Sequence, residues 1–188
     1  MKKILIDRNT FIPMPVTLVG ALVDGKPNFM AVGWVSRVNA APPCIAVGIY
    51  KGHYTPVGIE QNRAFSVNFP GTDLLVETDY CGIVSGRKAD KSKIFDLFYG
   101  ELKTAPMIDP CPLCLECRLL DVHELPTNKL FIGEIVASYT EEKYLTDGQP
   151  DYKKMDAMIL TMPDNKYWTL GVVAGDAWSE GKKMKKGR

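Results

Sequence analysis

A possible anion-binding site is encoded around residue 55. Thr55 is followed by Pro56, a pair typical of a helix start, since threonine is a good N-cap and proline is favoured in the first turn. The amides of a first helical turn lack intrahelical partners and carry the positive end of the helix dipole, so they favour anions. Lys51 and His53 lie just upstream. This segment therefore predicts a phosphate site formed by Lys51, His53 and Thr55. A capped surface helix beside an ordinary lysine would explain the same pattern.

A second polar loop contains Ser85, Gly86 and Lys91. Glycine permits close approach of the backbone to a ligand, and a lysine side chain is long enough to reach a phosphate group. The loop therefore has the chemistry to cover an anion. The alternative is the C-terminal end of a helix followed by solvated basic residues, namely Arg87, Lys88, Lys91 and Lys93.

Three evenly spaced cysteines, Cys111, Cys114 and Cys117, have the spacing of the first three ligands of an iron–sulfur motif. No cysteine occupies the expected fourth position. If the run is a strand, Cys111 and Cys117 face one side and Cys114 the other, so three ligands cannot converge. We therefore expect no metal ligands here, and a redox-sensitive thiol is the remaining alternative, which depends on exposure and thiol pKa.

These residues must be positioned by a β-rich scaffold. The Asp24-Gly25 pair predicts a tight hairpin, a second helix is expected from residue 72 to residues 82–86, and residues 146–150 are typical of a loop tip. The order of elements favours a mainly β fold, a β-barrel with peripheral helices. Five apolar and β-branched runs predict strands at residues 16–23, 44–50, 64–69, 113–122 and 130–139.

Composition limits the possible classes of protein. The chain has 188 residues, 46% of them hydrophobic, enough for one compact domain over residues 1–188. A formal net charge of +1 and the lack of a basic helix argue against a nucleic-acid partner. Residues 1–8 do not resemble a signal peptide and no apolar run could span a membrane, so we expect no membrane association and a cytoplasmic location. The five cysteines are then expected to be reduced thiols. A short basic tail ends the chain, with Lys182, Lys183, Lys185, Lys186 and Arg188.

Two nucleotide-binding motifs are absent from the sequence. No G-x-G-x-x-G follows a strand and no G-x-x-x-x-G-K-[ST] occurs, so neither a Rossmann dinucleotide site nor a P-loop is predicted.

An ordered series of short motifs extends along almost the whole chain. They lie at residues 13–16, 27–30, 34–36, 42–43, 51–55, 65–68, 81–86 with 90–91, 111–117, 130–134, and 168–171 with 178. No single motif is specific, but the ordered set resembles the flavin reductase-like, FMN-binding split-barrel family. Within that family it is most similar to the flavoredoxin-type branch.

This resemblance implies a Greek-key-like split barrel that binds FMN at the interface of a homodimer. The flavin ring is expected against residues 31–36, with the phosphate at the Lys51 to Thr55 segment. Trp34 either stacks on the flavin or is a buried strand aromatic. The expected cofactor-binding residues are Val32, Gly33, Trp34 and Val35 at the ring edge, Ser36 and Asn68 as polar contacts, Lys51, His53 and Thr55 at the phosphate, and Ser85, Gly86, Lys91 and Trp178.

One departure from the family pattern bears on activity. Flavin reductases proper often have a Gly-Asp-His element before the strand that matches residues 130–136, whereas this chain has Pro126-Thr-Asn-Lys129. The resemblance therefore favours an FMN-dependent oxidoreductase in electron transfer, supplied by NAD(P)H or a ferredoxin-like donor, over rapid NAD(P)H oxidation. His123 is expected to be structural, on the same strand face as Cys117 and Leu119. The alternative is a non-enzymatic FMN-binding or cysteine-based metal-binding module.

Overall fold

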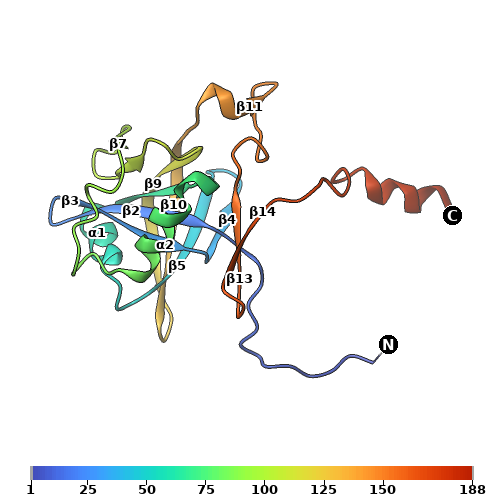
Figure 1. Cartoon of the computed structure of the whole chain (residues 1–188), viewed down its shortest axis with the longest axis horizontal. Helices are drawn as coiled ribbons and strands as arrows, with labels where there is room; N and C mark the ends of the chain where they lie inside the picture. Colours follow the sequence, from blue (N-terminus) through green and yellow to red (C-terminus); the bar gives the residue numbers. More distant parts are fainter. Residues whose placement is uncertain (1, 188) are drawn as a thin grey trace.

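The computed structural model describes residues 2–187 and is built around one large antiparallel sheet (Figure 1). Its strands lie in the order β3-β2-β6-β9-β10-β5-β4. All five strand predictions are confirmed, with ends that differ by at most two residues. The strands are β2 Thr17–Val23, β3 Lys26–Val32, β4 Val35–Asn39, β5 Cys44–Tyr50, β6 Ala64–Phe69, β9 Leu113–Glu124 and β10 Asn128–Tyr139.

Two tight hairpins follow directly from local sequence. β2 and β3 are joined by Asp24 and Gly25, whose φ angles are 51° and 76°. Positive φ at both central residues matches the right-handed twist of the flanking strands. The loop tip predicted near residue 148 is also a hairpin, in which Asp147 and Gly148 join β11 Leu145–Thr146 to β12 Gln149–Pro150.

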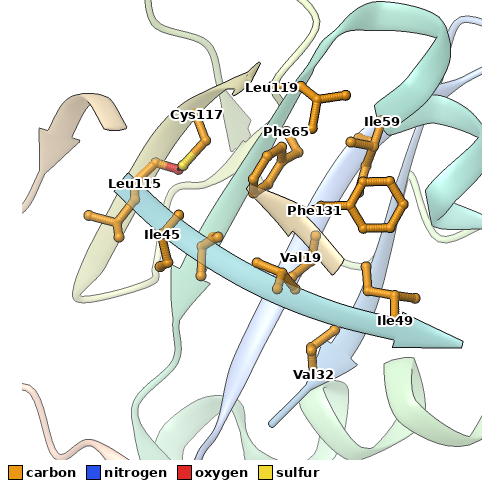
Figure 2. Close-up of a cluster of buried hydrophobic side chains, with 13 residues drawn as sticks. Val19, Val32, Ile45, Ile49, Ile59, Phe65, Leu115, Cys117, Leu119 and Phe131 are labelled. Carbon is orange, nitrogen blue, oxygen red and sulfur yellow. The ribbon is translucent and has the colours of Figure 1, made fainter. Parts of the chain in front are cut away.

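The main core lies on one face of the large sheet. Alternate residues of several strands point into it, as the two-residue period of a β-strand requires. Figure 2 shows Phe65, Phe131 and Ile59 among the side chains of this core. Because strands from both halves of the sheet contribute, the sheet wraps around this cluster as expected for a barrel. Its members are Val19, Ala21, Val32, Ile45, Val47, Ile49, Ile59, Phe65, Val67, Leu115, Cys117, Leu119 and Phe131.

Two short helices flank the sheet. α1 spans Thr55–Asn62 and packs on β2, where Asn62 Nδ2 donates to the carbonyl oxygen of Leu22 at 2.7 Å. α2 spans Leu75–Ile83 after a 3-10 turn, η1 Thr72–Leu74, which confirms the second predicted helix. In the part of the chain that the structure describes, no helix is long and apolar enough to cross a membrane.

Several small elements complete the fold. A three-stranded sheet joins β1 Met14–Pro15, β13 Met158–Thr161 and β14 Lys166–Thr169, and a two-stranded ladder joins β7 Leu97–Phe98 and β8 Met107–Ile108. The 3-10 turn η2 Glu142–Tyr144 precedes β11. After β14 the chain leads away from the barrel to η3 Glu180–Gly187 (Figure 1). Of the predicted basic tail, Arg188 lies outside the described residues.

The cysteines are not grouped on the strand faces that the alternation pattern predicted. Cys111 and Cys114, not Cys111 and Cys117, belong to the same buried cluster. The prediction was wrong because β9 begins only at Leu113, so Cys111 lies in a turn where strand alternation does not apply. Burial raises the pKa of the Cys111 and Cys117 thiols, which disfavours reactive thiolates. Within residues 2–187, no three His, Cys, Asp or Glu side chains are grouped to hold a metal ion.

His123 is also placed differently from the prediction. A register shift in the β9–β10 pairing leaves Leu120 as an extra residue between Leu119 and Asp121. Such a bulge reverses the alternation beyond it. Val122 therefore packs against the core and His123 is exposed.

We predict that Gly58→Ala destabilises the fold by about 1–3 kcal/mol, the usual cost of overpacking. A Cβ at this position of α1 would lie 2.1 Å from the carbonyl oxygen of Leu22, so α1 has to move away from β2. Urea unfolding measures the change in free energy. Gly171→Ala is the matched control, since its added methyl meets nothing within 4 Å. Equal stability of the two variants would contradict the close packing of α1.

Candidate functional site

A groove lies between β3, the start of α1 and the end of α2. It consists of two adjoining pockets that share Met30, Ala31 and His53. We call the first, of about 170 Å³, the polar pocket and the second, of about 260 Å³, the strand pocket. The lining of the groove is polar at one end and largely apolar at the other, which is typical of small-molecule sites.

The polar pocket brings together residues that are distant in the sequence. His53 and Thr55 come from the start of α1, and Ser85, Gly86 and Lys91 come from the loop after α2. All five were among the predicted site residues, and the structure places them around one cavity. The two polar segments of the sequence thus form a single feature of the fold.

Lys91 is the most unusual residue of this pocket. Only 3% of its surface is exposed, and its Nζ donates to the carbonyl oxygens of Phe29 at 2.9 Å and Cys81 at 3.0 Å. No carboxylate of the described residues forms an ion pair with it. Burial lowers the pKa of Lys91 below its usual value, because removing a charge from water is costly. The pocket wall therefore holds a cation that lacks an anion.

Thr55 has a different role in the helix from the one expected. It is the first residue of α1, Tyr54 precedes it, and no side chain caps the helix. The Thr55 hydroxyl instead accepts a hydrogen bond from Asn28 Nδ2 at 2.7 Å. Asn28 belongs to β3 and is itself buried, so this bond fixes α1 against the strand and leaves the hydroxyl proton free to donate to a ligand.

His53 lines both pockets. Its partial burial and, secondarily, the nearby charge of Lys91 lower the pKa of the imidazole below 6.5. His53 is therefore mostly neutral at pH 7 and offers one donor and one acceptor. Its ring packs edge-on against Tyr50, with centroids 5.6 Å apart.

The strand pocket forms where β3 gives way to β4. Gly33 and Trp34 lie in this break, and the carbonyl oxygen of Trp34 accepts from the amide of Gly48 at 2.8 Å. Trp34 is 50% exposed, which excludes the alternative of a buried strand aromatic. Val32 also lines this pocket.

Val35 and Ser36 lie on the other side of Trp34. They line a wider apolar pocket of about 680 Å³ together with Phe11 and Leu130, and this pocket shares Gly33 and Trp34 with the groove. Phe11 packs on Trp34 with ring centroids 6.4 Å apart. The Ser36 hydroxyl donates to the carbonyl oxygen of Arg37 at 3.2 Å.

Three other predicted residues line neither the groove nor the wider pocket. Lys51 forms an ion pair with Glu124 at 2.8 Å. Asn68 is fully buried, where its Nδ2 donates to the carbonyl oxygen of Leu18 and its Oδ1 accepts from the amide of Ile108. Trp178 is 93% exposed on the segment that leaves the barrel. None of the three lines either pocket.

The sequence reasoning missed several lining residues. Asn28 and Met30 had a detectable signal, since both lie in the short motif at residues 27–30, and Tyr54 had one in the motif at residues 51–55. Tyr50 had none, because its place in the groove depends on how β3 and β5 meet, whereas Ala31 had been expected against the flavin ring as part of the segment 31–36.

Comparisons with known proteins agree with this geometry. The family model described as "Flavin reductase like domain" matches residues 8–156. A flavoredoxin structure from Methanosarcina acetivorans is 60% identical, with a TM-score of 0.96 over 98% of this chain and 100% of that chain. The flavoredoxin of Desulfovibrio vulgaris (Miyazaki F) is 34% identical, with a TM-score of 0.88 over 96% of this chain and 100% of that one.

Two further comparisons bear on the fold. An uncharacterized protein of Archaeoglobus fulgidus is 34% identical over 141 residues, which are 74% of this chain and 78% of that protein. A Shewanella frigidimarina protein described as having a split barrel domain is 19% identical with a TM-score of 0.78 over 89% of this chain and 87% of that chain. The predicted mainly β split barrel is thus confirmed.

We predict that replacing Lys91 by Met raises the pKa of His53, because the variant removes a neighbouring positive charge. NMR titration of the imidazole protons measures the shift in the ligand-free protein. Lys93→Met removes an exposed charge nearby in the sequence and serves as the control. An unchanged His53 pKa in Lys91→Met would contradict the proximity of the two side chains.

Proposed function

The chain belongs to the flavin reductase-like family, and from this premise we propose that it is an FMN-binding flavoprotein that transfers electrons, of the flavoredoxin type. The single observation that carries the proposal is the buried, unpaired Lys91 at the polar end of a groove whose other end is largely apolar. FMN combines the same two features, an anionic phosphate and a flat ring system.

The polar pocket fits a phosphate group in charge and in hydrogen bonding. A phosphate monoester carries about −1.5 to −2 charges at pH 7, so it would supply the counter-ion that Lys91 lacks. His53, Thr55 and Ser85 add neutral donors around the same cavity. These four side chains would hold the phosphate, and Gly86 would let the loop backbone approach it.

The strand pocket fits the flavin ring. Gly33 and Trp34 would face the ring, with Val32 beside them, and Met30 and Tyr50 add apolar contact area. When bound, FMN supplies the one- and two-electron chemistry, while the protein positions it and adjusts its electronic properties. Asn68, Lys51 and Trp178 are left out of this proposed set because none of them lines the groove.

The electron donor is proposed from the residues around the groove. His123 is exposed on β9 and lines neither pocket, so it is not positioned to assist hydride transfer to a ligand there. We therefore favour a ferredoxin-like protein donor, with NAD(P)H as the alternative. Steady-state NAD(P)H oxidation with free flavin separates the two, since fast turnover would favour a reductase.

A homodimer completes the proposal. The groove and the wider pocket are open, and large apolar side chains beside them are half exposed, among them Trp34, Val38 and Tyr50. Covering such an apolar surface with a second copy would remove it from water. The molar mass in solution, from light scattering, tests this part of the proposal.

We predict that the purified protein is yellow and releases FMN on denaturation. Because the groove combines a buried cation at one end with apolar side chains at the other, the bound flavin should remain through gel filtration. The visible spectrum, followed by chromatography of the released chromophore, measures this. A colourless protein that also fails to bind added FMN would overturn the proposal, and a brown, iron-containing one would favour a cysteine-bound cluster.

We predict that Lys91→Met weakens FMN binding about tenfold or more, equivalent to about 1.4 kcal/mol, because the phosphate loses its buried cation. Riboflavin, which lacks the phosphate, should bind the variant and the wild type alike. Quenching of flavin fluorescence measures both dissociation constants, and Lys93→Met is the control. If Lys91→Met weakened both ligands equally, Lys91 would support the fold and not the phosphate.

A further inference from the structure

A small cavity lies apart from the groove, beside the start of β9. It has a volume of about 190 Å³, and two of the evenly spaced cysteines, Cys111 and Cys114, line it. We call it the thiol pocket. None of its residues lines the polar pocket or the strand pocket, so the proposed flavin site makes no use of it. The other lining residues are Phe98, Asp109, Tyr139, Thr140 and Glu141.

The two cysteines of the thiol pocket lie close together. Both belong to the same buried cluster, whereas Cys117 belongs to the main core. Burial raises the pKa of Cys111, and a hydrogen bond with the Cys114 side chain raises it further. Neighbouring thiols of this kind meet the first requirement for a disulfide, which can form only over a short distance.

The turn that carries the pair is fixed on both sides. Pro110 and Pro112 flank Cys111, and each proline restricts its own φ angle. The amide of Cys111 donates to the carbonyl oxygen of Ile108 at 3.1 Å, and the Thr140 hydroxyl donates to the carbonyl oxygen of Pro112 at 2.7 Å. Two groups held in place within one molecule react without the entropy cost of bringing them together.

The surroundings give the two sulfur atoms different roles. The pKa of Cys111 is raised by burial and also by the negative charge that Cys114 carries when ionised, so Cys111 keeps its proton while Cys114 is a thiolate. The thiolate is the nucleophilic form of cysteine. Cys114 is therefore the sulfur suited to attack an oxidant, and Cys111 is suited to close the disulfide afterwards.

Size and charge limit what can enter the thiol pocket. Its volume lies below the usual range of small-molecule sites, about 300–1,000 Å³. Two carboxylates, Asp109 and Glu141, line it, and among residues 2–187 no basic side chain does. The pocket therefore disfavours anions. An oxidant that reaches the thiols has to be small and uncharged, as hydrogen peroxide and short alkyl hydroperoxides are.

We propose that Cys111 and Cys114 form a reversible redox site, at which a small neutral hydroperoxide oxidises the two thiols to a disulfide. The Cys114 thiolate attacks the terminal peroxide oxygen and becomes a sulfenic acid. The O–O bond breaks, and the alkoxide or hydroxide that leaves takes up the proton that Cys114 had released. The Cys111 sulfur then displaces the sulfenic hydroxyl group, which leaves as water with the Cys111 proton. The dithiol loses two electrons and two protons, and the hydroperoxide is reduced to an alcohol, or to water, and one further water.

The test treats the full chain with hydrogen peroxide and counts its thiols. Labelling with N-ethylmaleimide in urea, followed by mass spectrometry, should find two labelled cysteines fewer than the five of the untreated chain. Peptide mapping should identify the bond as Cys111 to Cys114, and dithiothreitol should restore both thiols. This readout is independent of the proposed function because it measures sulfur and not flavin.

Single variants separate the roles of the two cysteines. Cys111→Ala should stop at the sulfenic acid of Cys114, which dimedone labels, and Cys114→Ala should leave Cys111 unoxidised. Cys81→Ala is the matched control, since Cys81 belongs to the same buried cluster but does not line the thiol pocket, and it should still form the disulfide.

Other results would overturn the proposal. An intact set of thiols in the peroxide-treated wild type, or a disulfide that includes another cysteine, would exclude the redox site. Dimedone labelling of Cys114→Ala but not of Cys111→Ala would reverse the assigned roles. Glutathione disulfide, which is larger and anionic, tests the choice of oxidant. Compared with the urea-unfolded chain, folding should slow its reaction with the pair about tenfold more than that of hydrogen peroxide, and equal slowing would contradict a small neutral oxidant.

Discussion

The buried ammonium of Lys91 is the constraint on which the candidate site depends. Removing a charge from water costs several kcal/mol unless polar groups replace its hydration. Here the replacement is two backbone carbonyls, one from Phe29 on β3 and one from Cys81 on α2. These bonds tie the loop of residues 85–91 to a strand and to a helix, so the same interaction that offsets burial of the charge also builds the polar pocket.

The groove takes its two-sided character from the elements around it. Its polar end is formed where α1 and the loop after α2 meet β3, and the Asn28–Thr55 hydrogen bond holds that junction. Its apolar end is formed where β3 breaks at Gly33 and Trp34 before β4 begins. α1, whose start borders the polar end, packs closely on β2 through Gly58.

The cysteines show how burial decides between alternative chemistries. All five are free and buried, and the evenly spaced run is divided between two core clusters. A thiol in an apolar environment keeps its proton, as the raised pKa of Cys81, about 11, illustrates. In this fold the free cysteines act as small apolar core residues.

The sequence by itself determined the local elements and the residue types of the site. Apolar and β-branched runs predict the strands, Asp24-Gly25 predicts a hairpin, and the two segments around residues 51–55 and 85–91 supply the polar and basic side chains of the candidate site, because these properties depend on near neighbours in the chain. Only the tertiary structure decided which of these groups meet. His53, Thr55 and Lys91 share a pocket. Lys51 instead forms an ion pair with Glu124, and Asn68 is hydrogen-bonded inside the core. Such choices depend on strand register, on the bulge at Leu120 and on the packing of helices against the sheet, and these are set by contacts between residues far apart in the sequence.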